Sequence, residues 1–196
     1  MSGNTRVPPA EITGVYGAVM KRFSRKMFGE VPDALSVMWH SRPVLMASFG
    51  LGRKSAKWTA CDKDLKSYAH MAVASLVGCS FCLDLGYFQA NNEGLDMTKA
   101  REVPAWREST VFTPLERDVL EYAEAMSQTP PTVTDELSAR LLDRLGLAAL
   151  VELTAFISAA NMAARTNVAL GIEAEGLSAK CGLAPLARPS GLASQA

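Results

Sequence analysis

Two cysteines three positions apart, Cys79 and Cys82, are the residues of this sequence best suited to chemistry. On one helical turn both sulfurs lie on the same side, so they can form a disulfide or share a metal ion. Gly78 predicts that one helix ends there and that the next begins at Cys79. Because a helix N-terminus stabilises negative charge, a thiolate is favoured at Cys79. The pair therefore indicates a reactive dithiol.

Zinc binding and simple burial are the alternatives to redox chemistry at this pair. The chain has two further cysteines and two histidines, all isolated in the sequence: Cys61, Cys181, His40 and His70. A structural zinc site needs about four ligands, so these residues would have to converge from distant positions. A free cysteine can also be a small buried apolar side chain. We favour the redox interpretation and expect neither a metal nor an organic cofactor.

Composition excludes several classes of partner. Twenty Lys and Arg residues balance 20 Asp and Glu residues, so no field of one sign attracts nucleic acid or a membrane surface. Residues 1–9 lack the apolar run of a secretory signal, which predicts a cytoplasmic protein. Residues 145–172 are apolar and long enough to span a bilayer, but scattered polar residues favour a buried helix instead. These polar residues are Glu152, Asn161, Arg165 and Asn167.

The elements that must position the cysteines are helices. Apolar residues recur at helical spacing along nearly the whole chain, which predicts an all-α fold of about seven to eight helices. We expect them near residues 11–28, from 33 onward with a break at Pro43, 64–76, 79–91, 96–102, 113–127, and from 134 with a turn at Gly146. Three parts are predicted: an N-terminal helical extension (1–30), a helical domain (31–176) and a flexible tail (177–196).

Three stretches resemble one known family. Residues 72–90, AVASLVGCSFCLDLGYFQA, resemble the Cys-x-x-Cys segment of carboxymuconolactone decarboxylase-like proteins, in the branch that contains the alkylhydroperoxidase D-type peroxidases. Residues 113–172, with their Glu-Leu-Thr-Ala and Asn-Met-x-x-Arg elements, resemble the C-terminal half of that domain. His40-Ser41-Arg42-Pro43 matches its early helix, so the resemblance covers about residues 30–172.

This resemblance implies a compact helical domain that assembles into homo-oligomers, either trimers or hexamers. It implies a peroxidase whose cysteines cycle between dithiol and disulfide, with a hydroperoxide as substrate and a thiol reductant as partner. In the family the second cysteine, here Cys82, attacks the peroxide and the first, here Cys79, resolves the intermediate. The helix-terminus argument favours Cys79 as the more acidic thiol, so the order of attack stays open.

The sequence departs from the family pattern at the proton relay. Ser67 and Gly86 occupy the positions of the family's glutamate and histidine, and neither can act as a base at neutral pH. Phe81 stands where some members carry histidine or tyrosine. His70 lies one helical turn after Ser67, so it is the candidate substitute base.

The remaining polar and aromatic candidates are interpreted as structural. Asp84 should point away from the cysteines, and Arg165 should pair with a carboxylate of another helix. Core or packing roles are expected for three others: Tyr68, Tyr87 and His40.

Three functions follow in order. The first is a cysteine-based hydroperoxide reductase or thiol-disulfide oxidoreductase. The second is a diverged member, acting as a redox sensor or an oligomeric assembly protein, because the relay is missing. The third is a lactone decarboxylase, against which the thiol pair argues because that reaction needs acid–base and anion-binding groups.

Overall fold

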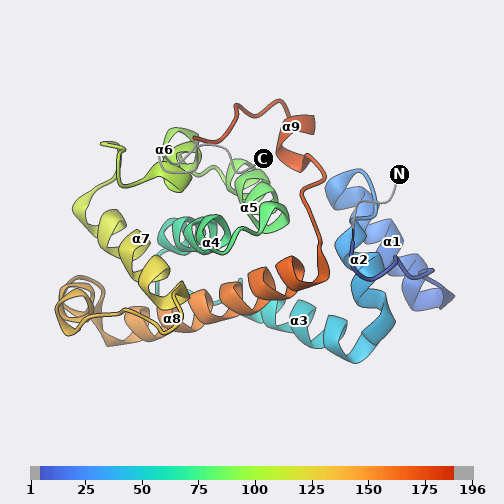
Figure 1. Cartoon of the computed structure of the whole chain (residues 1–196), viewed down its shortest axis with the longest axis horizontal. Helices are drawn as coiled ribbons and strands as arrows, with labels where there is room; N and C mark the ends of the chain where they lie inside the picture. The colour runs from blue at the N-terminus through green and yellow to red at the C-terminus, as the bar shows by residue number, and fades with distance from the viewer. Residues whose placement is uncertain (1–4, 188–196) are drawn as a thin grey trace.

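The computed structural model describes residues 5–187, and Figure 1 shows their arrangement. Within that range the chain forms nine α-helices and two 3₁₀ helices, with no strand. The helices are α1 (Gly14–Phe28), α2 (Asp33–Met38), α3 (Arg42–Ser55), α4 (Lys63–Val77), α5 (Ser80–Asn92), α6 (Met97–Glu102), α7 (Pro114–Ser127), α8 (Asp135–Leu170) and α9 (Leu177–Lys180). The 3₁₀ turns are η1 (Trp39–Ser41) and η2 (Val103–Ala105). The predicted all-α fold is confirmed.

Helix α4 is the centre of the domain. Helices α5, α7 and α8 pack around it, as Figure 1 shows. Its side chains are buried on most of its circumference, as expected of a helix inside a core: Leu65, Tyr68, Ala69, Met71, Ala72, Val73 and Ala74. The main core continues through Leu120 of α7 and Ile157 of α8. At the junction of α4 and α5 the packing buries Cys79 and Cys82, whereas Leu76 and Gly78 stay exposed.

The predicted junction before the cysteines is present. Asp62 caps the start of α4 by accepting hydrogen bonds from the backbone of Asp64 and Leu65. Gly78 ends the helix in the left-handed region, at φ 78°, where glycine carries no steric penalty. The chain therefore reverses from α4 into α5 through two residues, Gly78 and Cys79.

The break predicted at Pro43 is also present. The chain forms α2, then η1, and α3 begins with Pro43 in its first turn, where proline needs no amide hydrogen. Helix α3 then continues to Ser55. A turn at Gly146 divides α8, because φ is 77° at that residue.

The first helix contacts the protein through a different face than its apolar pattern suggests. Its buried residues are Gly17, Met20 and Ser24. Met20 packs in a small N-terminal core with Ile12, Leu35, Trp39 and Leu45. The larger apolar residues point outward, with Val15 85% and Val19 58% exposed. Tyr16, Phe23 and Met27 are partly exposed; Tyr16 also stacks on Trp39, and Phe23 packs edge-on against Phe49. We call Val15, Tyr16, Val19, Phe23 and Met27 the α1 stripe.

Helix α8 is buried on one side only, which corrects the prediction of a buried helix. It is long and apolar enough to cross a membrane, yet only 28% of its most apolar window is buried within the protein. Leu153, Ile157 and Ala164 face the core against α4 and α7. Leu147, at 77% exposed, and Val151 lie on the opposite side.

Candidate redox site

The two cysteines of the motif form a disulfide at the start of α5. Cys79 is the N-cap of this helix, and its Sγ accepts a hydrogen bond from the backbone N–H of Cys82 at 3.2 Å. Both residues are almost fully shielded, at 1% and 3% exposed. The helix N-terminus therefore supplies a backbone donor and a positive dipole end directly to the Cys79 sulfur.

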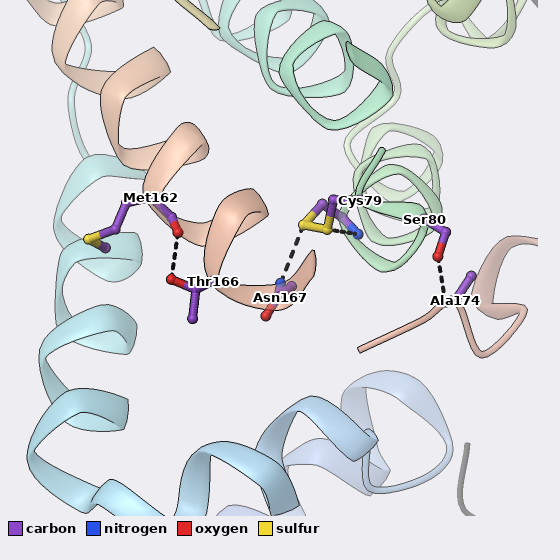
Figure 2. The surroundings of a disulfide bond; sticks show 7 residues. Cys79, Ser80, Met162, Thr166, Asn167 and Ala174 are labelled. Carbon is purple, nitrogen blue, oxygen red and sulfur yellow. Dashed lines mark hydrogen bonds between the residues drawn. A yellow bond between two sulfur atoms is a disulfide. The ribbon is translucent and has the colours of Figure 1, made fainter. Parts of the chain in front are cut away.

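A second donor reaches the pair from the far end of the sequence. Asn167, in the last turn of α8, donates from Nδ2 to Cys82 Sγ at 3.3 Å. Figure 2 shows its side chain directed at the disulfide. In the sequence, Asn167 is one of four charged or amide residues within the apolar stretch 145–172. Its polarity within an apolar helix was the one available signal of a specific contact.

The segment that follows α8 covers the start of α5. Ala174 donates its backbone N–H to Ser80 Oγ at 3.1 Å, next to Cys79, as drawn in Figure 2. Asp84 is buried and accepts hydrogen bonds from the backbone of Leu177 and Ser178 at 2.7 and 3.0 Å. Asp84 therefore holds the segment after α8 against α5.

The C-terminal segment is packed up to the last described residues. Tyr87 donates its hydroxyl hydrogen to the carbonyl of Ala184, and Ala187 donates its N–H to the carbonyl of Arg101. The sequence predicted a flexible tail over 177–196. The structure instead gives residues 177–187 these contacts and a short helix, α9, while residues 188–196 lie outside the described range.

His70 lies against the position where the family relay has its histidine. A Cβ on Gly86 would stand 3.1 Å from His70 Nδ1 and 3.3 Å from its Cε1. The imidazole thus occupies the space beside α5 that a side chain at position 86 would need, one turn after Cys82. Burial lowers the pKa of His70, so the ring is neutral at neutral pH.

The imidazole of His70 has no hydrogen bond to another residue in the described range 5–187. No fully buried side-chain nitrogen in that range lacks a partner, so the ring nitrogens keep some contact with solvent. A neutral imidazole of this kind can accept a proton. Ser67, by contrast, donates its hydroxyl hydrogen to the carbonyl of Lys63 within α4.

The aromatic candidates are structural. Tyr68 is buried and packs edge-on against Phe112, and burial raises the pKa of its phenol well above the usual range. Burial likewise raises the pKa of Tyr87. Phe81 belongs to the core, and His40 is exposed with Nε2 2.8 Å from the carbonyl of Pro8.

The ion pairing expected of the long helix involves a different residue. Within the described range Arg165 contacts the carbonyl of Ser127 and the side chain of Asn161, with no carboxylate partner. Glu152 forms the buried pair, with Lys66 at 2.7 Å. Burial of Glu152 opposes ionisation, but hydrogen bonds from Lys66, Ala60 and Cys61 outweigh it and lower the pKa of the carboxyl.

The arrangement can accept and donate two electrons. In residues 5–187 no group of three or more His, Cys, Asp or Glu side chains could hold a metal ion. The remaining cysteines take no part in the disulfide, and burial raises the pKa of Cys61 to about 11, which makes it a poor nucleophile. Within the described residues, Cys79 and Cys82 are thus the cysteines placed to interconvert between dithiol and disulfide.

Comparisons with known proteins identify the family of this chain. The profile of the carboxymuconolactone decarboxylase family matches residues 43–125. The uncharacterized protein YnjA of Escherichia coli strain K12 is 36% identical over 155 residues, which are 78% of this chain and 85% of YnjA.

Two solved structures share the fold. The debrominase Bmp8 in complex with 2,3,4-tribromopyrrole has a TM-score of 0.76 at 21% identity, covering 92% of this chain and 97% of Bmp8. An uncharacterized peroxidase-related protein from Ralstonia eutropha JMP134, described as an alkylhydroperoxidase AhpD core, has a TM-score of 0.77 at 14% identity, covering 89% of this chain and 94% of that one.

Proposed function

Since the chain belongs to the carboxymuconolactone decarboxylase family, we propose that it is an oxidoreductase whose Cys79–Cys82 dithiol reduces hydroperoxides without a metal or organic cofactor. One observation carries this proposal: the two sulfurs are joined at the N-terminus of α5 and each accepts a hydrogen bond there. Donors of this kind favour the thiolate, which is the reactive form of cysteine.

The reaction has two steps. The Cys82 thiolate attacks the distal oxygen of the hydroperoxide, the O–O bond breaks, and the alkoxide leaves as an alcohol after taking up a proton. The Cys79 thiol then attacks the resulting sulfenic acid, which forms the disulfide and releases water. A dithiol reductant returns both cysteines to the reduced state by thiol-disulfide exchange.

His70 is the proposed base, because its neutral imidazole occupies the space that Gly86 leaves open. A positioned base typically contributes about 10²- to 10⁴-fold to the rate. We expect His70→Ala to slow turnover by about 10²-fold or more. The double change His70→Ala with Gly86→His moves the imidazole to the family position and should recover part of the loss. Equal rates for wild type and His70→Ala would remove this role.

The experiment on function counts thiols. Reduced protein receives one equivalent of cumene hydroperoxide, and the expected loss is two thiols per chain at Cys79 and Cys82. Cys82→Ser should abolish turnover with a dithiol reductant, whereas Cys61→Ser and Cys181→Ser serve as matched cysteine controls and should retain it. A reversible disulfide without turnover supports a redox sensor instead. Both thiols remaining titratable would rule out the peroxidase, and decarboxylation of a carboxylated lactone by a protein lacking both cysteines would favour a lactone decarboxylase.

Reductive dehalogenation is a second candidate, favoured by the missing relay and by the likeness to the debrominase Bmp8. A thiolate can take bromine from a protonated bromoarene, with the C–Br electron pair passing to carbon. The second thiol then displaces bromide and forms the disulfide. The proton lost by the Cys82 thiol passes to the arene carbon, the Cys79 thiol releases its proton to solvent, and bromide leaves unprotonated. The leaving group therefore needs no proton from a residue at position 67 or 86, whereas the alkoxide formed in peroxide reduction does. Bromide release from 2,3,4-tribromopyrrole, measured by ion chromatography with Cys82→Ser as control, distinguishes the two reactions.

The protein is further proposed to form a homo-oligomer, a trimer or hexamer, in the cytoplasm. The α1 stripe supports this, because several large apolar side chains of one helix are exposed together. Light scattering after size exclusion is expected to give a multiple of the 21.0 kDa chain mass, and Val19→Glu with Phe23→Glu should lower it. A monomeric wild type would exclude the assembly. Cell fractionation tests the location.

A further inference from the structure

We propose that Asn167 stabilises the Cys82 thiolate and thereby sets the reduction potential of the Cys79–Cys82 couple, an inference that rests on the proposed redox use of this pair. Asn167 Nδ2 lies 3.3 Å from Cys82 Sγ, across 85 positions of sequence. The donor of this hydrogen bond to the Cys82 sulfur is a side chain, and Figure 2 draws the bond beside the disulfide.

The turn that carries Asn167 is held in place by its own backbone and by the start of the chain. The carbonyl of Asn167 accepts the N–H of Ile172 at 2.9 Å, where Gly171 ends α8 in the left-handed conformation. Arg6 donates from its guanidinium to the carbonyls of Val168 and Ala169, at 2.6 and 2.8 Å. The amide is therefore positioned at the sulfur before any reaction takes place.

A hydrogen bond at this position favours the reduced state. A neutral disulfide sulfur accepts hydrogen bonds weakly, whereas bonds to a charged acceptor are roughly twice as strong as neutral ones. When a reductant thiolate attacks Cys79 Sγ, a mixed disulfide forms, the Cys79–Cys82 bond breaks, and its electron pair goes to Cys82 Sγ. The amide N–H of Asn167 faces the negative charge that develops there.

The two sulfurs are thus served by different parts of the fold. Cys79 accepts its hydrogen bond from the backbone of α5, and Cys82 accepts from a side chain of α8. A change at position 167 therefore alters the environment of one sulfur and leaves the donor to the other in place. This separation allows the contribution of Asn167 to be measured.

The test uses the full chain in three variants. Asn167→Ala removes the donor, Asn167→Asp keeps the size and places a carboxylate at the sulfur, and Asn161→Ala is the control. Asn161 is an amide of the same helix that donates to Ser127 instead of a cysteine. Circular dichroism confirms folding, and the nearly isosteric Asp variant covers a failure of the Ala variant to fold.

Two readouts report on the sulfur. The first readout is the dithiol–disulfide equilibrium constant, measured in glutathione redox buffers. It should shift about tenfold toward the disulfide in Asn167→Ala, which for two electrons is about 30 mV, and further in Asn167→Asp. The pH midpoint of Cys82 alkylation by iodoacetamide, followed by peptide mass mapping, should rise in the same order. Asn161→Ala should match wild type in both. Values for both Asn167 variants that equal wild type, or equal the Asn161→Ala control, would overturn the inference.

Neither readout uses a hydroperoxide, so the two proposals fail separately. A wild type that does not turn over peroxide, with a shifted potential in Asn167→Ala, refutes the peroxidase and supports the role of Asn167. Peroxide turnover by the wild type, together with an unchanged reduction potential in both Asn167 variants, supports the peroxidase and refutes the role of Asn167.

Discussion

Replacing Gly86 with alanine tests the contact between His70 and α5 through protein stability. Gly86 is a buried residue inside α5, and alanine there should gain about 1 kcal/mol of helix propensity. The new Cβ would stand 3.1 Å from His70 Nδ1, 3.2 Å from Met71 Cγ and 3.3 Å from His70 Cε1. These distances are shorter than an ordinary contact of about 3.5–4.0 Å.

The magnitude follows from the balance of these two effects. Overpacking of a core costs about 1–3 kcal/mol, so Gly86→Ala in the wild type should be neutral or destabilise by up to about 2 kcal/mol. In a His70→Ala background two of the three close contacts disappear, and the flexible Met71 side chain can adjust. Gly86→Ala should then stabilise by about 1 kcal/mol, which gives a coupling of about 1–3 kcal/mol.

Urea denaturation of the four proteins of this cycle measures the coupling. Gly50→Ala in α3 is the matched control, because it is also a helical glycine but nothing lies within 4 Å of its Cβ position. It should stabilise by about 1 kcal/mol in both backgrounds. Independent sites add to within about 0.5 kcal/mol, so a coupling below that value for Gly86 would refute the packing of His70 described above.

Three further results are expected. The free energy of unfolding should fall as pH drops below about 6.5, the unfolded-state pKa of histidine. Burial lowers the pKa of His70 in the folded protein, so the unfolded chain binds the proton first. In His70→Gln the midpoint of urea unfolding should depend less on pH over this range. Lys66→Met should lower the free energy of unfolding by about 3–5 kcal/mol, measured by thermal and urea unfolding, because it leaves the Glu152 carboxylate without its partner in a site where the two side chains are 7% and 10% exposed. Adding Glu152→Leu should recover most of this loss. Asp84→Ala should lower the free energy of unfolding by about 1–3 kcal/mol, and limited proteolysis should cleave the segment after Gly176 faster. Unchanged cleavage would contradict the anchoring role of Asp84.

Much of the local structure was predictable from short segments. The helix between Asp62 and Gly78, the break at Pro43 and the start at Thr113 each depend on a cap or a proline, which act within a few residues. The spacing of Cys79 and Cys82 likewise allowed a disulfide before any fold was known.

Contacts between distant segments required the tertiary structure. Asn167 reaches Cys82 across 85 positions and Asp84 holds α9 across more than 90, and no periodic pattern encodes which helix ends meet. His70 was a candidate by its place on α4, but only the packing of α5 puts its ring against Gly86.

The α1 stripe illustrates the same limit. Tyr16, Val19 and Phe23 recur at helical spacing within the helix predicted at residues 11–28, because helical periodicity is a local property. The buried face is instead that of Gly17, Met20 and Ser24. The sequence by itself determined most of the helices and the spacing that allows the Cys79–Cys82 disulfide. The tertiary structure decided which faces are covered and which donors reach each sulfur, because both depend on how the helices pack against one another.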